Sequence, residues 1–332
     1  MSPAALSSSQ VKPYPPGIHV PTLTWFKDDE DQNLDWEVQE THLRFLITSG
    51  LHGIVIAGTN GEAAALSQKE RLDLIRLTRQ VAEASGKPDL PITVGCNGGC
   101  TRAVIEETIA AADAGADYAL VLVPSYFHFA MTSDAITAFF LEVADKSPIP
   151  IVVYNFPGVV SGLDVNSEML DVLGQHPNIV AVKLTCGGIA KVARAAAKFG
   201  AFNGKTGGES FRALAGQSDW LVPALIIGGA GCITGLANLY PKACLEMYER
   251  WKSGRLAGAV EIQNELAKSE IGFGQGGING TKWIVAKLRG YPEGSSHCRR
   301  PYPRFSDDKK KSWLAGKMEI CMPLEASLAD SK

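Results

Sequence analysis

The amino-acid sequence predicts an α/β fold, a (β/α)8 or TIM barrel with a C-terminal helical extension. Short apolar runs alternate with longer segments of helical periodicity from residue 18 onward. Most of these runs are hydrophobic at consecutive positions, which is typical of parallel strands covered on both faces. Eight such runs within about 230 residues match the size of one barrel. A doubly wound open sheet is the alternative that this pattern leaves open.

The eight runs give the predicted strands in chain order. The first six are IHVPTLT, GIVIAGT, PITVGC, DYALVLV, IPIVVYN and IVAVKLT, which start near residues 18, 53, 91, 117, 149 and 179. The last two are AFNGKTG from residue 201 and VPALIIG from residue 222. The eighth lies in an uncharged stretch of 22 residues at 220–241. Proline and glycine interrupt this stretch, so we expect a buried strand, a turn and a helix start rather than a membrane span.

Capping residues predict where the helices begin and end. Ser67 precedes a segment of helical periodicity and Glu70 follows three residues later, which forms a capping box for a helix over residues 67–85. Thr101 and Ser133 are expected to cap the next two helices. Two glycines stand where a left-handed residue should end a helix: Gly86 and Gly115.

The pattern changes after residue 250, where no further strand is predicted. Three helical segments follow, separated by glycine and proline, at residues 253–270, 279–290 and 305–329. Three short helices bury too little surface to fold alone, so we expect them to pack on the barrel. The predicted organisation is an N-terminal extension at 1–17, the barrel at 18–250 and a helical extension at 251–332.

Composition excludes several classes of partner. The 332 residues carry 32 Lys and Arg against 35 Asp and Glu, so no excess of positive charge is present to bind nucleic acid or an anionic membrane. The seven cysteines are an odd number spread along the chain, which favours free thiols in a reducing compartment. The N-terminus lacks the features of a secretory signal and the arginines of a mitochondrial presequence. We therefore expect a cytoplasmic protein with a small-molecule substrate.

Three motif matches lack the context that their function requires. A GxGxxG pattern at 272–277 follows a polar helical segment rather than a buried strand, so no dinucleotide site is predicted. Residues 204–206 resemble the end of a phosphate-binding loop, but the preceding glycine is one residue too close. Cys96 and Cys100 have no second Cys or His pair at ligand spacing. We expect neither a metal nor an organic cofactor.

A reactive side chain occurs at the end of the sixth predicted strand. In a barrel of this kind, catalytic groups lie where strands end and loops begin. Lys183 lies inside the apolar run IVAVKLT, where an ammonium ion is costly to bury. Burial favours the neutral form of an amine, which is a nucleophile toward carbonyl carbon. The alternatives are a lysine paired with a carboxylate and one whose amine reaches solvent at the strand end.

Two further strand ends carry groups that could assist such an amine. Tyr154 ends the fifth predicted strand, where a phenol could carry protons; an ordinary core aromatic is the alternative. The turn at 58–61 exposes backbone N–H groups beside the Thr59 hydroxyl and the Asn60 amide. Such a turn could hold a carboxylate, and a plain connection between strand and helix is the alternative.

Taken together, these strand ends resemble those of a known enzyme family. The motifs GTNGE, PSYF, YNFP and VAVKLT occur in the order and spacing of the dihydrodipicolinate synthase and N-acetylneuraminate lyase family, whose members are class I, pyruvate-dependent aldolases. The resemblance extends from residue 17 to residue 289. It implies a (β/α)8 barrel with a C-terminal helical bundle, usually a homotetramer, that uses no metal or organic cofactor.

The resemblance also implies roles for the matching residues. Lys183 matches the lysine that forms the Schiff base, and Tyr154 matches the tyrosine that acts as general acid and base. Thr59 and Asn60 match the pair that holds the pyruvate carboxylate. The amine would attack the C2 ketone, and the cationic imine would withdraw electrons so that the C3–C4 bond breaks.

Three further positions match the family pattern. Tyr126 matches a tyrosine that in some members reaches into the site of the neighbouring subunit. Gly207 and Ile233 match backbone positions that line the pocket. With the four residues above, these complete the predicted site.

One departure from the family bears on the substrate. Dihydrodipicolinate synthases carry an arginine after the tyrosine–asparagine motif that binds the second substrate's carboxylate, whereas residues 158–162 read GVVSG here. A second anionic group is poorly served, which argues against aspartate semialdehyde and weakens 4-hydroxy-2-oxoglutarate. We therefore expect a 2-keto-3-deoxy sugar acid. Likeness to fungal enzymes favours 2-keto-3-deoxy-L-galactonate (L-threo-3-deoxy-hexulosonate), cleaved to pyruvate and L-glyceraldehyde in galacturonate catabolism.

Two alternatives of other classes stay open. The turns at 204–210 and 228–231 could hold a phosphorylated substrate after the last two strands. A non-catalytic relative could keep the fold without the chemistry, although the joint presence of Lys183, Tyr154 and Tyr126 argues against it.

Overall fold

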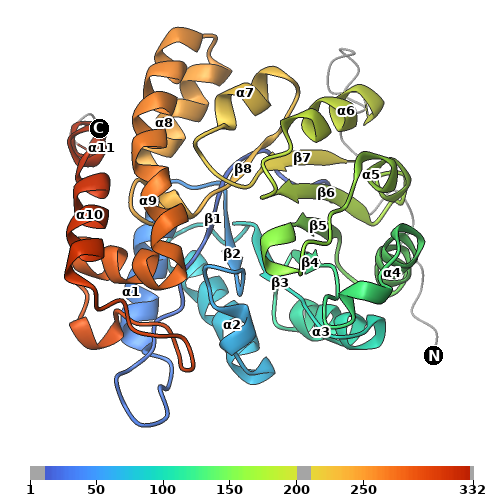
Figure 1. Ribbon diagram of the computed structural model, residues 1–332, viewed down its shortest axis with the longest axis horizontal. Helices are drawn as coiled ribbons and strands as arrows, with labels where there is room; N and C mark the ends of the chain where they lie inside the picture. Colours follow the sequence, from blue (N-terminus) through green and yellow to red (C-terminus); the bar gives the residue numbers. More distant parts are fainter. Residues whose placement is uncertain (1–11, 200–210, 330–332) are drawn as a thin grey trace. The chain divides into compact units, whose positions relative to one another are not determined.

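The structure, a computed structural model, describes residues 12–199 and 211–329 of the chain. Its eight strands form a closed barrel in the order β1 to β8. Strands β1 and β2 pair in parallel, as do the successive pairs from β3 to β8. Helices alternate with the strands along the chain (Figure 1). The predicted (β/α)8 barrel is therefore confirmed, and the open doubly wound sheet is wrong.

The strands are short and buried, as the apolar runs predict. Their bounds are β1 Gly17–Pro21, β2 Gly53–Ile56, β3 Ile92–Gly95, β4 Tyr118–Leu122, β5 Ile151–Asn155, β6 Ile179–Leu184, β7 Arg212–Ala215 and β8 Gly231–Ile233. The α-helices between and directly after them are α1 Trp36–Thr48, α2 Gln68–Ala84, α3 Thr101–Asp113, α4 Ser133–Lys146, α5 Ser167–Leu173, α6 Ile189–Phe199, α7 Leu221–Ile226 and α8 Pro241–Lys252. The first six strands coincide with the first six predicted runs. Every residue of β5 and β6 is buried, so both strands lie in the hydrophobic core.

The last two strands differ from the prediction. The strand predicted at 201–207 lies outside the described residues, and β7 follows it. The strand predicted at 222–228 is wrong, because helix α7 occupies Leu221–Ile226 and β8 comes after it. A short apolar run is compatible with a buried strand or a buried helix, and Pro223 falls in the first turn of α7, where a helix tolerates proline.

The predicted helix caps are correct for α2 and wrong by one residue for α3 and α4. At α2 the Ser67 hydroxyl accepts a hydrogen bond from the Glu70 N–H, and the Glu70 carboxylate accepts one from the Ser67 N–H. Cys100 precedes α3 without a side-chain bond, and Thr132 caps α4. Both helix-ending glycines have the expected positive φ angles: +72° at Gly86 and +102° at Gly115.

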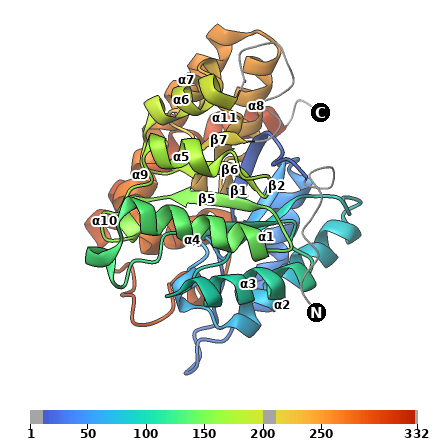
Figure 2. The same ribbon diagram turned by 90° about the vertical axis from the view of Figure 1, so that its right-hand side faces the viewer.

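Residue contacts divide the chain into two compact units. The first comprises Met1–Pro16, Pro91–Gly216 and Pro223–Cys232, and the second comprises Gly17–Leu90, Gln217–Val222 and Ile233–Lys332. In the first unit, helices α3, α4, α5 and α6 pack one against the next (Figure 2). The predicted division of the chain at residues 17 and 250 stays a prediction.

The second unit contains the C-terminal helices α9 Leu256–Arg289, α10 Asp308–Glu319 and α11 Met322–Ala329. Helix α9 packs against α8 and α10 (Figure 1). It joins the two helices predicted at 253–270 and 279–290, with Gly277 in a non-helical conformation at φ 62°. Of the GxGxxG glycines, Gly272 and Gly274 thus lie in the helical part before the kink, and Gly277 lies at the kink. A Cβ atom on Gly272 would lie 2.4 Å from Met318 Cε, so close helix packing explains that glycine.

The uncharged stretch at 220–241 forms α7, β8 and the residues that lead into α8. None of the helices in the described part of the chain is both long and apolar enough to cross a membrane.

Candidate active site

Lys183 lies on β6 within the hydrophobic core of the first unit. Its side chain is 3% exposed, and its neighbours Val182 and Leu184 are fully buried. The register of the parallel strands pairs Lys183 with Tyr154 of β5. Side chains that are paired across adjacent strands point to the same side of the sheet. The Lys183 Nζ accordingly lies 4.2 Å from the centroid of the Tyr154 ring.

The contacts of Lys183 decide between the alternatives for a lysine at this position. Within residues 12–199 and 211–329, no carboxylate lies within ion-pair distance of its amine. Its low exposure also excludes an amine that reaches solvent at the strand end. The side chain is therefore a buried amine beside a phenol, which is an arrangement suited to attack on a carbonyl with proton transfer nearby.

Tyr154 is buried at the end of β5 and also contacts Phe156, with the ring centroids 5.9 Å apart. The next residue, Asn155, fixes the segment that follows. Its Oδ1 accepts a hydrogen bond from the Val165 N–H at 3.0 Å, and its Nδ2 donates to the Asp164 carboxylate at 2.7 Å. The loop after the catalytic candidate is therefore closed at its base by a buried amide side chain.

The loop at 156–164 contains the positions where an arginine is missing. Pro157–Val159 forms a short 3-10 helix, and Ser161 and Gly162 both adopt positive φ angles. Lys191 of α6 contacts this loop, with its Nζ 2.6 and 2.7 Å from the two carboxylate oxygens of Asp164. That charge is already neutralised, so it offers little to a second substrate carboxylate.

Tyr126 follows β4 and is 82% exposed. Phe127 and Phe129 beside it are exposed as well, and the Phe127 ring contacts each of the other two edge to face. The structure does not bring Tyr126 into contact with Lys183 or Tyr154 within this chain. Large exposed aromatic groups of this kind are typical of surfaces that bind another molecule.

The turn that carries Thr59 and Asn60 follows β2 in the second unit. The Glu62 N–H donates to the Thr59 carbonyl at 3.0 Å, which closes a tight turn. A glycine is required at position 61, because a Cβ there would lie 3.0 Å from the Thr22 carbonyl oxygen. Close approach also explains Gly235, where a Cβ would lie 2.4 Å from the Asn60 Nδ2.

The two remaining predicted positions have different outcomes. Ile233 is the last residue of β8 and is fully buried. Gly207 lies outside the described residues. The turn at 204–210, which was considered as a phosphate site, lies outside them too.

Sequence reasoning missed a buried carboxyl group in the second unit. Glu270 of α9 accepts hydrogen bonds from the Ser218 N–H at 3.1 Å and the Thr234 hydroxyl at 3.4 Å, and it contacts the Ser218 hydroxyl. Burial raises the pKa of this carboxyl to about 7. It also missed Lys282, which is buried against Glu62. Glutamate and lysine in a helical segment ordinarily face solvent, so neither residue gave a sequence pattern that marked it as buried.

No grouping of three or more His, Cys, Asp or Glu side chains suited to a metal ion occurs among the described residues. The chemistry available at Lys183 and Tyr154 is that of an amine and a phenol.

Comparison with known proteins identifies the family. The model of the dihydrodipicolinate synthetase family matches residues 15–316. The chain is 39% identical over 290 residues to "Probable 4-hydroxy-2-oxoglutarate aldolase, mitochondrial" of Emericella nidulans, covering 87% of this chain and 90% of the relative. It is 36% identical over 314 residues to "L-threo-3-deoxy-hexylosonate aldolase" of Hypocrea jecorina, covering 95% and 98%.

A solved structure agrees with the sequence comparison. A dihydrodipicolinate synthase family protein from Coccidioides immitis superposes with a TM-score of 0.82 at 35% identity, covering 96% of this chain and 98% of that one. The family match spans most of the chain, and the buried lysine on β6 fits the chemistry of the class. The chain belongs to the dihydrodipicolinate synthetase family and is a class I aldolase, a Schiff-base aldehyde-lyase.

Proposed function

We propose that the chain cleaves a 2-keto-3-deoxy sugar acid, 2-keto-3-deoxy-L-galactonate, to pyruvate and L-glyceraldehyde in galacturonate catabolism. The observation that carries the chemistry is the buried Lys183 amine, with no carboxylate partner among the described residues and with the Tyr154 ring 4.2 Å away. A buried amine without a counter-charge is the group required for attack on a ketone.

In the proposed mechanism, the Lys183 amine attacks the C2 carbonyl of the substrate and water leaves as the imine forms. The cationic imine accepts the electron pair of the C3–C4 bond when that bond breaks, which gives an enamine and releases the aldehyde. Tyr154 takes the proton of the C4 hydroxyl, because its ring lies beside the lysine. Protonation at C3 and addition of water then release pyruvate and restore the amine.

The turn with Thr59 and Asn60 is proposed to hold the carboxylate next to the ketone. A tight turn presents backbone N–H groups, a hydroxyl and an amide, all of which can donate hydrogen bonds to an anion. Fixing the carboxylate would orient the ketone toward the amine.

The choice of a sugar acid depends on the loop at 156–164. Its sequence contains no arginine, and Lys191 is occupied by both oxygens of Asp164. A substrate whose aldehyde half is neutral and hydroxylated needs no cation from this loop. A substrate with a second carboxylate finds no counter-ion within the described residues 156–164. The relative from Hypocrea jecorina that is named for a 3-deoxy-hexulosonate supports this choice.

The alternative substrate is 4-hydroxy-2-oxoglutarate. The relative from Emericella nidulans bears that name, and a relative from Coccidioides immitis at 39% identity over 321 residues bears it too. An enzyme like dihydrodipicolinate synthase is a further alternative within the family.

The substrate is tested by measuring pyruvate release from 2-keto-3-deoxy-L-galactonate, its stereoisomers and 4-hydroxy-2-oxoglutarate in parallel. We expect kcat/KM for a sugar acid to exceed that for 4-hydroxy-2-oxoglutarate. The reverse order would show that the loop at 156–164 does not exclude a second carboxylate.

A phosphorylated substrate would need different groups, and its test is separate. In that case inorganic phosphate would inhibit competitively and Lys183→Ala would retain turnover. For an aldolase we expect borohydride to trap pyruvate on Lys183 as a stable mass increase, and Lys183→Ala to lose turnover.

We also propose that the chain assembles into a homo-oligomer, as a tetramer by resemblance to the family. The exposed aromatic side chains of Tyr126, Phe127 and Phe129 support this proposal, since they would be covered by a second copy. Sedimentation equilibrium measures the assembly. If Tyr126 acts across subunits, a mixture of the Tyr126→Phe and Lys183→Ala variants should regain activity that neither has alone.

The compartment stays a proposal. We expect a cytoplasmic enzyme, while the relatives from Emericella nidulans and Coccidioides immitis are named mitochondrial. Imaging a fusion of the full chain to a fluorescent protein at its C-terminus decides between the two.

A further inference from the structure

Glu62 occupies an unusual position at the end of the turn that carries Thr59 and Asn60. Its backbone is left-handed, with φ 54° and ψ 42°, which disfavours any residue other than glycine, asparagine or aspartate. Its N–H donates to the Thr59 carbonyl, so the position of Glu62 determines how the turn closes. A strained conformation of this kind persists only where its surroundings hold it in place.

The Glu62 carboxylate is held by two segments from late in the chain. Its Oε1 lies 2.7 Å from the Nζ of Lys282 on α9, and both side chains are 1% exposed. Its Oε2 accepts a hydrogen bond from the Arg299 N–H at 2.9 Å. Both oxygens are therefore engaged, as a buried carboxylate requires.

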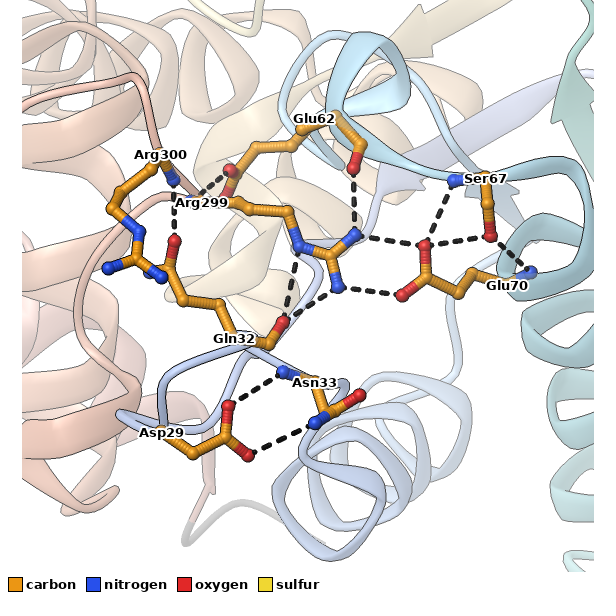
Figure 3. Close-up of polar contacts among 9 residues, drawn as sticks. Asp29, Gln32, Asn33, Glu62, Ser67, Glu70, Arg299 and Arg300 are labelled. Atoms are coloured by element: carbon orange, nitrogen blue, oxygen red, sulfur yellow. Dashed lines mark hydrogen bonds and ion pairs between the residues drawn. The ribbon is translucent and has the colours of Figure 1, made fainter.

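The Arg299 side chain ties the same segment to residues that follow the turn and to the loop that contains Gln32 (Figure 3). Its guanidinium makes two bonds to the Glu70 carboxylate, of 2.6 and 2.9 Å, at the start of α2. It also donates to the Gln32 carbonyl at 2.7 Å and to the Ala65 carbonyl at 2.8 Å. A planar guanidinium with this many acceptors is fixed in orientation, so the backbone N–H that Glu62 uses is fixed as well.

The Lys282 side chain is similarly fixed. Its Nζ lies 4.2 Å from the centroid of the Phe26 ring, and the Arg299 guanidinium lies 4.3 Å from the same ring. Burial lowers the pKa of Lys282, and the negative charge of Glu62 opposes that effect. The pair is thus an ion pair in an apolar site, where loss of either partner leaves the other without a counter-charge.

Thr24 holds the residue next to Glu62 in the turn. The Thr24 hydroxyl donates to the Gly61 carbonyl at 2.7 Å, and Thr24 is buried. The end of the turn at residues 61–62 is therefore fixed by groups that are separate from Thr59 and Asn60.

We propose that Glu62 is a positioning residue for carboxylate recognition, and that its contacts with Lys282 and the Arg299 N–H hold the Thr59–Asn60 turn in the shape that binds the carboxylate of pyruvate. This inference rests on the proposed function, because it takes the turn as the carboxylate site. It assigns the C-terminal segment around residues 282 and 299 a role in substrate affinity.

The proposal predicts that substrate affinity and the reactivity of the Lys183 amine will respond differently to a change at Glu62. Disturbing Glu62 should weaken affinity for a ketone that carries a carboxylate and leave the attack of the Lys183 amine unchanged. A merely structural role would instead reduce trapping of every ketone in proportion to the fraction of protein unfolded.

The test is borohydride trapping on Lys183 in the full chain, with pyruvate and with acetone, which lacks the carboxylate. In Glu62→Gln we expect the pyruvate concentration for half-maximal trapping to rise by about 10- to 100-fold, the effect of a misplaced binding group. The trapping rate at saturating pyruvate and the rate with acetone should change by less than about threefold.

Three further variants make the result decisive. Glu265→Gln is the matched control, because it is the same chemical change in an exposed ion pair with Lys268 on α9, and we expect wild-type behaviour. Thr24→Val is a milder change to the same turn and should show the same division with a smaller rise; it decides the question if Glu62→Gln does not fold. Adding Glu62→Gln to Asn60→Ala should cause no further loss of pyruvate affinity, because both act on one site.

Two results would overturn the inference while leaving the aldolase intact. One is a folded Glu62→Gln or Thr24→Val protein whose half-saturation for pyruvate stays within about twofold of wild type. The other is an equal loss with pyruvate and acetone. Absence of trapping on Lys183 in the wild-type protein would instead refute the proposed function, and this inference with it.

Discussion

Two lysines of this chain are buried to a similar degree, and their surroundings differ. Lys282 lies in the second unit with the Glu62 carboxylate at 2.7 Å and an aromatic ring at 4.2 Å. Lys183 lies in the first unit with a phenol ring at 4.2 Å and, among the described residues, no carboxylate within ion-pair distance. The ring contacts are alike, and the counter-charge is the difference.

This difference teaches that burial alone does not identify a reactive lysine. A carboxylate at contact distance stabilises the ammonium form and makes the amine a poor nucleophile. Without that partner, a buried amine is available to a carbonyl carbon. Substitution by methionine should therefore abolish turnover at position 183 and lower the free energy of unfolding at position 282. The following variants test this difference.

The largest expected effect is the loss of turnover in Lys183→Met. We expect pyruvate release to fall by about 10³-fold or more, because the covalent intermediate cannot form. Methionine has nearly the volume of lysine and removes a buried amine that has no ion pair with any described residue, so the free energy of unfolding should change by less than about 1.5 kcal/mol. Urea unfolding measures the stability. A protein that keeps its turnover would contradict the assignment.

Removing the phenol beside the lysine should have the next largest effect. In Tyr154→Phe we expect kcat to fall by about 10²- to 10⁴-fold, the usual contribution of a general acid or base. Borohydride should still trap pyruvate on Lys183, because the amine is unchanged. Loss of trapping together with turnover would show that Tyr154 acts in forming the imine as well as in breaking the carbon–carbon bond.

The same lysine-to-methionine change at position 282 should act on stability. Breaking a buried pair by removing one partner costs about 3–5 kcal/mol, so we expect the free energy of unfolding of Lys282→Met to fall by that amount in urea titration. Adding Glu62→Gln should recover part of the loss, since it removes the uncompensated charge. Lys268→Met, in an exposed pair with Glu265, is the control and should cost less than about 1 kcal/mol. Equal losses at 282 and 268 would contradict the comparison.

A third buried ionisable group, Glu270, extends the comparison to the pH dependence of stability. Burial raises its pKa from 4.5 to about 7, so the folded chain holds this proton between those pH values while the unfolded chain releases it. Stability from this group therefore falls as pH rises from 4.5 to about 7, by about 3 kcal/mol at most. Glu270→Gln should be more stable than wild type at pH 8, and the difference should vanish at pH 4. A constant difference would show that Glu270 does not titrate in this range.

The sequence predicts the positions of Lys183 and Tyr154 well. Residues 179–184 form a continuous apolar run, and a single lysine in such a run is visible without a structure. Tyr154 could be placed beside it because parallel strands of a barrel end together. These predictions need only local pattern and one rule of topology.

Other features depend on contacts that the sequence does not reveal. The apolar run at 222–228 suits a helix or a strand, so its local pattern could not predict that α7 occupies Leu221–Ile226. Lys282 lies in a helix, where lysine ordinarily faces water, and its partner Glu62 is 220 residues away. The sequence thus indicates the chemistry through Lys183, Tyr154 and the GTNGE turn. The contacts of Lys282 and Arg299 with Glu62 of that turn are visible only in the structure.

The large sequence separation between Glu62 and its partners affects when the turn can be completed during protein synthesis. Its carboxylate needs Lys282 and Arg299, which are 220 and 237 residues further on. During synthesis at about 5–20 residues per second, the turn exists for ten seconds or more before its anchors leave the ribosome. A chain that ends before residue 282 therefore contains the residues of β1 to β8 and Lys183, yet lacks the supports of the turn. The turn can therefore reach its final conformation only after the C-terminal segment has been synthesised.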